Sequence, residues 1–219
     1  MKGIGIVSEA LNRRERRVLS GLRSPFSIQS FLDGLAYSTD HFYRCPLRVL
    51  HDLKAQCFDG GLFAAMALRR LGHRPLIIDM VPNGRDDDHI LALYKIDGHW
   101  GAVAKSNFAG LRFREAVYRT VRELVMSYFE VYFNLAGEKT LRAYTKPLDL
   151  SSFDKYNWTT SGDHLELIVS RLDEIHRVSI ITSRAVRRLS PVDERSLRAG
   201  LLGSVKGGLY RPSPKKNSR

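Results

Sequence analysis

Cys57 and His89 are the residues whose types and spacing best suit chemistry. Cys57 opens the run 57–72, whose pattern predicts a helix with the cysteine in its first turn. A helix N-terminus carries about half a positive charge and unpaired N–H groups, and both stabilise the thiolate, the nucleophilic form of cysteine. His89 opens an apolar run that predicts a strand. The pair therefore indicates a thiol acyl-transfer site, with Cys57 as nucleophile and His89 as general base.

A catalytic imidazole also needs a partner that accepts a hydrogen bond from its second nitrogen. Asp97-Gly98 predicts a two-residue hairpin turn, and its register, extended outward, places Ser106 opposite His89. Asn107 has a carbonyl oxygen suited to the role but needs a bulge to reach His89. Three alternatives remain open here: Asn107, Ser106, or no third side chain.

The surroundings of Cys57 predict the rest of such a site. An oxyanion hole would use the backbone N–H of Cys57, with the side chain of Gln56 assisting. Gly60 and Gly61 favour close packing of the first helical turn. The acidic run 86–88 lacks the ligand spacing of a calcium loop, so we expect a solvated loop, no metal and no cofactor.

The segment 43–150 resembles the transglutaminase-like superfamily, which is related in layout to papain-like thiol enzymes. Four motifs carry the resemblance: Cys57-Phe58-Asp59-Gly60-Gly61-Leu62-Phe63, Leu68-Arg69-Arg70-Leu71-Gly72-His73, Asp88-His89-Ile90-Leu91-Ala92 and Gly98-His99-Trp100. The family's strand after the tryptophan normally carries an aspartate where this chain has Ala104. Residues 111–115 and 122–129 look like a bacterial subgroup whose members are mostly of unknown activity. The resemblance implies a cysteine acyltransferase or peptidase.

The elements that would position the pair come in the order helices, then strands, then helices. Apolar spacing predicts helices at 27–35, 46–54, 57–72 and 115–134, from Asp163 onward, and before Gly203. Strands are predicted at 76–81, 90–96, 99–105 and 141–148. The expected fold class is α+β, with a small antiparallel sheet in the middle. We expect a transglutaminase-like domain over 1–150, a helical extension over 151–203 and a basic flexible tail over 204–219.

Charge and cysteine content narrow the function class. The net charge is +12; residues 51–183 are neutral, with 17 basic and 17 acidic side chains, so the excess lies at the two ends. No run approaches the ~18 apolar residues of a membrane span, and the N-terminus lacks the apolar stretch of a secretory signal. Two cysteines do not make a disulfide framework. We therefore expect a cytoplasmic protein with free thiols.

Three functions remain in competition at this stage. The first is hydrolysis or transfer of an acyl group from a peptide, protein or small amide, the choice between water and amine being open. The second is a catalytically inactive transglutaminase-like scaffold, favoured by the missing aspartate. The third is a basic module that binds nucleic acid through its two ends. The sequence contains no nucleic-acid-binding motif, which argues against this function. The sequence leaves the oligomeric state open.

Overall fold

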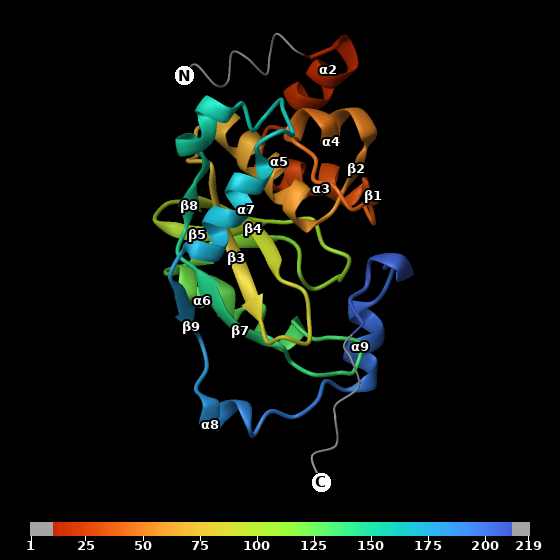
Figure 1. Cartoon of the computed structure of the whole chain (residues 1–219), viewed down its shortest axis with the longest axis vertical. Coiled ribbons are helices and arrows are strands. Elements are labelled where there is room, and N and C mark those ends of the chain that lie inside the picture. Colours follow the sequence, from red (N-terminus) through yellow and green to blue (C-terminus); the bar gives the residue numbers. More distant parts are fainter. Residues whose placement is uncertain (1–10, 212–219) are drawn as a thin grey trace.

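A mixed sheet-and-helix architecture of the α+β class is present in the computed structural model, which describes residues 11–211 (Figure 1). Six strands follow the order β6-β5-β4-β3-β7-β9, and β8 pairs with β3 beside this path. Every pairing in this sheet is antiparallel. The strands are β3 (Leu76–Pro82), β4 (His89–Ile96), β5 (His99–Val103), β6 (Arg114–Tyr118), β7 (Leu141–Thr145), β8 (Leu148–Asp149) and β9 (Arg177–Ser179). A short parallel pair, β1 (Ala36–Tyr37) and β2 (Lys54–Ala55), lies apart from it.

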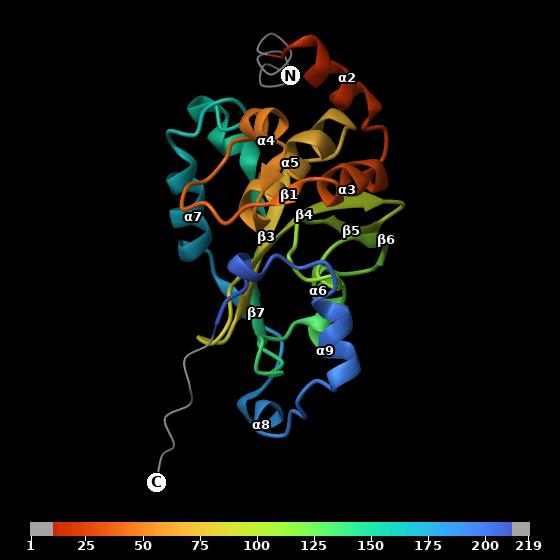
Figure 2. The same ribbon diagram turned by 90° about the vertical axis from the view of Figure 1, so that its right-hand side faces the viewer.

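Helices cover both faces of the sheet, and alternate residues of the strands serve different cores. On β4, Ile90 and Ala92 join the core under α3, α4, α5 and α7, whereas Leu91 and Leu93 join the core around α6. Successive strand residues point to opposite faces, which produces this division. The helices, seen from the side in Figure 2, are α2 (Arg13–Gly21), α3 (Pro25–Asp33), α4 (Pro46–Asp52), α5 (Cys57–Arg70), α6 (Val121–Met126), α7 (Leu165–Glu174), α8 (Ser183–Val186) and α9 (Glu194–Gly200).

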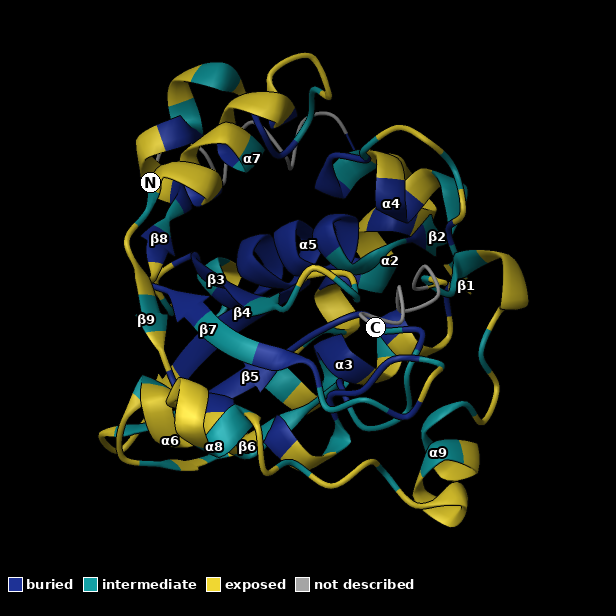
Figure 3. Cartoon of the chain, turned by 60° about the horizontal axis from the view of Figure 1, so that its bottom comes forward, coloured by how far each residue is buried: buried dark blue, intermediate teal, exposed yellow. Residues whose placement is uncertain are grey.

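The central helix α5 confirms the helix predicted over 57–72. Its residues are buried from Phe58 to Leu68, so that it is dark along most of its length in Figure 3. It ends at Arg70, and the φ of 92° at the following Gly72 lets the His73 N–H donate to the Leu68 carbonyl at 3.0 Å. The start of this long buried helix is where Cys57 is held.

The β4–β5 hairpin has the predicted turn and the predicted register. Asp97 and Gly98 both have positive φ, 47° and 82°, as a type I′ turn requires. Pairing runs from Ile96↔His99 to Ala92↔Val103 and stops there. The register predicted from the turn is therefore right near the turn, but the ladder does not extend as far as Ser106 and His89.

The helix predicted over 115–134 is wrong in its first half. Residues Arg114–Tyr118 form the edge strand β6, α6 covers only Val121–Met126, and a 3₁₀ turn, η1, follows at Phe129–Val131. Burial alternates along β6 with a period of two, and Val117 is 62% exposed. Thr120 accepts a hydrogen bond from the Glu123 N–H and so starts the helix later than the apolar spacing implied.

The C-terminal third is part of the same sheet and core. Strand β9 pairs with β7, and α7 contributes Leu165, Ile168 and Leu172 to the core under α5. The 3₁₀ turns η2 (Leu150–Tyr156) and η3 (Lys206–Gly208) complete the described elements. Of the tail predicted over 204–219, residues 212–219 lie outside the described part. Within residues 11–211, no helix is both long and apolar enough to cross a bilayer.

Candidate active site

Every residue that the sequence predicted for the catalytic site lines one cavity of about 250 Å³. Its walls come from the start of α5, the end of β1, β3, the start of β4, the loop after β5, α7 and the C-terminal segment. The predicted residues that line it are Gln56, Cys57, His89, Ser106 and Asn107. Residues from distant parts of the chain thus meet at the N-terminus of α5.

Cys57 is fixed in the first turn of α5 by the carboxylate of Asp59. Gln56 is the extended residue before the helix, and its backbone N–H donates to Asp59 Oδ2 at 3.2 Å. The other oxygen, Oδ1, accepts a hydrogen bond from the Arg44 N–H at 2.7 Å. Burial raises the pKa of Asp59 to about 6, against the pull of these two N–H donors. A carboxylate near the start of a helix also complements its dipole.

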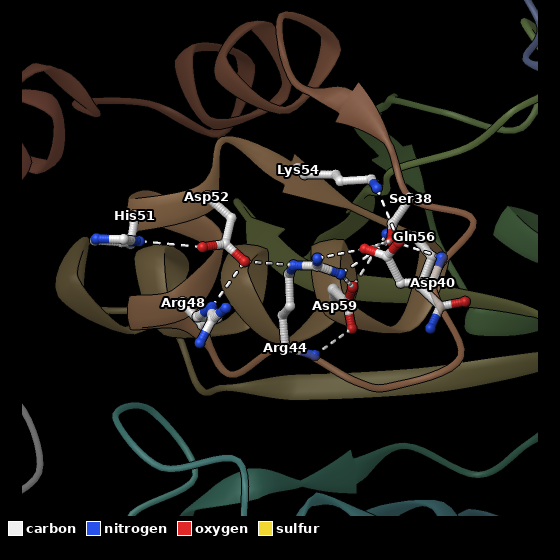
Figure 4. Close-up of polar contacts among 9 residues, drawn as sticks. All are labelled: Ser38, Asp40, Arg44, Arg48, His51, Asp52, Lys54, Gln56 and Asp59. Atoms are coloured by element: carbon white, nitrogen blue, oxygen red, sulfur yellow. Dashed lines mark hydrogen bonds and ion pairs between the residues drawn. The ribbon is translucent and has the colours of Figure 1, made fainter.

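Arg44 ties the segment before α5 together (Figure 4). Its guanidinium donates to Asp52 at 2.9 Å and to the Ser38 hydroxyl at 2.9 Å, and it pairs with Asp40 at 2.5 Å. Arg44 is only 4% exposed. The network holds the chain leading into Gln56 and Cys57 against β1 and α4.

Two glycines let the start of α5 lie directly on the sheet, as their position predicted. A Cβ at Gly61 would lie 2.5 Å from Ile90 Cγ2, and one at Gly60 would lie 2.2 Å from Lys105 Cβ. Real Cβ atoms do not approach so closely, so any larger residue would push the helix away. Because Ile90 follows His89 directly, this contact sets how close Cys57 lies to β4.

The surroundings of Cys57 favour the neutral thiol, whereas the sequence predicted a stabilised thiolate. Burial raises its pKa well above the ordinary value, and the negative charges of Asp88 and Asp79 raise it further. Hydrogen bonding from the backbone of Ile90 and Phe58 acts in the opposite direction but does not outweigh burial. Cys57 is half-buried, and desolvation by the surrounding protein outweighs these backbone hydrogen bonds, which favours the neutral thiol.

His89 is held by a backbone carbonyl. Its Nε2 lies 2.7 Å from the Leu111 oxygen, and since a carbonyl only accepts, Nε2 carries the proton. Nδ1 is then the basic nitrogen of the ring. His89 is 4% exposed, and burial lowers its pKa to about 4, although the Leu111 carbonyl raises it somewhat.

The two candidates for the third catalytic residue make other contacts. Asn107 Nδ2 donates to the carbonyls of Val205 and Gly208 at 2.9 and 3.0 Å, and its Oδ1 accepts from the Val205 N–H at 2.8 Å. Ser106 Oγ accepts from the Phe108 N–H at 3.0 Å. Asn107 therefore binds residues 205–208 to the edge of the cavity. This corrects the expectation that this part of the predicted tail is flexible. The acceptor for the His89 ring is the Leu111 carbonyl.

Asp79 is a further residue of the site, and the sequence pattern did not predict it. It lies in β3 opposite Ile90, is 4% exposed, and lines the same cavity. Its Oδ1 has no hydrogen-bond partner within the described residues. Burial, reinforced by the charge of Asp88, raises its pKa well above the usual value. A single aspartate inside the apolar run 76–81 was the available signal.

Ala104, which stands where the transglutaminase-like pattern has an aspartate, is part of a packing contact. The backbone of Ala104 exchanges two hydrogen bonds with the Gln29 side chain, at 2.9 and 3.1 Å. These bonds dock α3 on the end of β5. Ala104 thus contributes to packing where the family pattern has a carboxylate.

Among residues 11–211, no group of three or more His, Cys, Asp or Glu side chains is arranged to hold a metal ion. A scan against models of protein families gives no match for this chain. A search of curated proteins likewise gives no similar sequence.

Proposed function

We propose that this protein is a cysteine-dependent acyl-transfer enzyme of transglutaminase-like or papain-like layout, acting on an amide or ester by hydrolysis or transfer. The observation that carries the proposal is that Cys57, at the start of α5, and His89, at the start of β4, line one cavity. The Gly61–Ile90 contact supports it, because it is needed to bring the helix start onto that strand.

The chemistry follows from the protonation states. With Nε2–H bound to Leu111 O, Nδ1 of His89 accepts the proton as Cys57 Sγ attacks the substrate carbonyl. The N–H groups of the first turn of α5, that of Cys57 among them, would bind the developing oxyanion, with the Gln56 side chain assisting. The imidazolium then returns the proton to the leaving amine or alcohol, which leaves a thioester on Cys57. Water or an amine releases the acyl group in a second attack.

The buried environment favours a mechanism that starts from neutral groups. Burial raises the pKa of the Cys57 thiol and lowers that of His89, so both destabilise the separated charges of a thiolate–imidazolium pair. Proton transfer must therefore accompany attack on the substrate. His89 acts as general base during that step, which contributes about 10²- to 10⁴-fold to such reactions.

Acylation of Cys57 tests the proposal directly. The full-length protein with Cys45→Ser, so that one thiol reports, is mixed with p-nitrophenyl acetate, and the peptide containing Cys57 is followed by mass spectrometry. The account predicts an acetyl group on Cys57, release of nitrophenolate over repeated turnovers, and loss of both in Cys57→Ala. Adding glycinamide as acceptor distinguishes transfer from hydrolysis. If Cys57 remains unmodified while the protein is folded, the proposal is wrong.

A binding domain without catalysis is the second candidate, and two observations favour it. Within the described residues, no hydrogen bond joins Cys57 to His89, whose Nε2 is bound to Leu111. Ile90 faces the core of α5, so the preceding His89 starts on the other face of the strand. Folded protein that binds acyl compounds in the cavity without acylation of Cys57 would support this function.

A further inference from the structure

We propose that the Cys57 cavity selects an acyl donor that carries a cationic group, an alkylammonium or a guanidinium, and binds that group at Asp79. The inference deepens the proposed function and rests on it for the identity of the bound molecule as a substrate. The cation is a recognition group here, since an ammonium ion held by a carboxylate has no lone pair for attack.

The charge of the cavity is opposite to that of the chain. Its lining includes Asp79, Asp86, Asp87, Asp88 and Asp173, and no lysine or arginine among the described residues. The protein as a whole has a net charge of +12. Charges of one sign in a concave, low-dielectric site concentrate counter-ions of the other sign, so this cavity attracts cations.

Asp79 distinguishes this cavity from a solvated acidic surface. It lies at the inner end, 4% exposed, whereas Asp87, Asp88 and Asp173 are exposed. Its Oδ1 lacks a hydrogen-bond partner within the described residues. A buried polar atom without a partner costs free energy, and a donor supplied by a ligand would remove that cost. An ammonium or guanidinium supplies both the donor and the compensating charge.

The remaining walls suit an organic cation better than a metal ion. Aromatic rings line the cavity, among them Tyr37, Tyr43 and Phe58, and the faces of such rings attract ammonium and guanidinium groups. No metal-binding group of side chains is found among residues 11–211. Carboxylates and rings together match a cation on an apolar arm.

The charged neighbours of Asp79 predict that binding depends on pH. The groups that face Asp79 are acidic or ionisable side chains, those of Asp88, Asp173 and Cys57. The Tyr132 hydroxyl nearby donates to the carbonyls of Met80 and Asp87. Arg177 is a cation whose charge reaches Asp79, and its side chain pairs with Asp173 at 3.4 Å. Burial first, and then the charges of Asp88 and Asp173, favour the protonated form of Asp79, while Arg177 opposes them. An entering cation must therefore displace the proton. Affinity for the cation therefore rises with pH.

Cation binding would also affect the nucleophile. The charge of Asp88 raises the pKa of the Cys57 thiol, and a cation bound in the cavity offsets that charge, which favours the thiolate. A cationic substrate would thus lower the barrier to attack as well as bind. A neutral analogue of the same shape would gain neither effect.

The first experiment measures binding without chemistry. Calorimetric titration of the full-length Cys45→Ser protein with 1-pentylamine, and with 1-pentanol as uncharged control, should show binding of the amine alone. The affinity should rise from about pH 6 to about pH 9 with proton release. Asp79→Asn should weaken it about 10-fold, as expected for loss of a charged hydrogen bond, and abolish the proton release. Equal binding of amine and alcohol, or an unchanged affinity in folded Asp79→Asn, would overturn the proposal, as would binding of Mg²⁺ or Ca²⁺ in place of the amine.

The second experiment measures selectivity in the reaction. Cys57 should be acylated at least about 10-fold faster by p-nitrophenyl 4-guanidinobenzoate than by p-nitrophenyl benzoate, and Asp79→Asn should reduce that ratio toward one. Asp88→Asn, at the exposed rim, should reduce it less. A ratio of one in the parent overturns the cation site but leaves the enzyme proposal standing. Selective pentylamine binding with no acylation by either ester supports the cation site and overturns the enzyme proposal.

Discussion

The imidazole of His89 donates from Nε2 to the carbonyl oxygen of Leu111 at 2.7 Å, so a backbone group orients the candidate base. Thiol enzymes commonly give this task to a side-chain oxygen. A carbonyl fixes the tautomer equally well, because it can only accept a hydrogen bond. It carries no charge, however, and does little to stabilise an imidazolium. Burial lowers the pKa of His89, and the hydrogen bond to the Leu111 carbonyl offsets this only in part.

Protonation of His89 should destabilise the fold in acid. Its folded-state pKa is about 4, below the ordinary 6.5, so between these values the unfolded chain binds a proton that the folded protein does not. Stability is therefore lost as pH falls from about 6.5 toward about 4, by up to about 3 kcal/mol. Urea unfolding across this range should show a shallower loss in His89→Gln than in the parent. His51→Gln, at a 72% exposed side chain, is the control, and a loss in His89→Gln equal to the parent's would contradict the assignment.

Arg44 should matter far more to stability than its neighbour Arg48, although both bind Asp52. Arg44→Ala leaves Asp59 and Asp52 without a buried cation and should cost about 3 kcal/mol. Arg48 is 57% exposed, and Arg48→Ala should cost less than about 1 kcal/mol. Chemical denaturation measures both. Similar costs for the two variants would show that the Arg44 network does not hold the start of α5.

Gly61→Ala tests the close contact between α5 and β4. The added methyl would meet Ile90 Cγ2 at 2.5 Å, and overpacking of this kind costs about 1–3 kcal/mol. We also expect slower acylation of Cys57, since the helix start must move. Gly21→Ala meets nothing within 4 Å and should leave both stability and acylation nearly unchanged. A Gly61→Ala protein as stable and reactive as the Gly21→Ala protein would refute the contact.

Asn107 should restrict access to Cys57 because its hydrogen bonds hold the C-terminal segment in place. Asn107→Ala removes the bonds to Val205 and Gly208, each worth about 1 kcal/mol, so local opening becomes more frequent. In the Cys45→Ser background, iodoacetamide should modify Cys57 about 10-fold faster or more. Thr182→Ala, which removes the N-cap of α8, is the control. An unchanged rate in Asn107→Ala would show that this segment does not cover the thiol.

The parts of the fold that could be predicted from the sequence are those fixed by local rules. The Asp97-Gly98 turn sets the β4–β5 register, and the apolar pattern with Gly72 sets α5. Strand β6 was missed because its residues also fit a helical spacing, and pairing with β5 decides between the two. The partner of His89 could not be predicted because it is a backbone carbonyl, which leaves no sequence pattern. The partner of Asn107 could not be predicted because it lies about 100 residues away in the chain.

The rate of Cys57 acylation as a function of pH, with and without His89, tests the central claim most directly. In the Cys45→Ser protein with p-nitrophenyl acetate, the account predicts acylation near neutral pH that declines in acid with an apparent pKa near the 4 of His89. Cys45→Ser/His89→Ala should be at least about 100-fold slower there, and its rate should rise steadily into alkali with ionisation of the Cys57 thiol. Two superimposable pH profiles would contradict the claim that His89 serves Cys57 as its base.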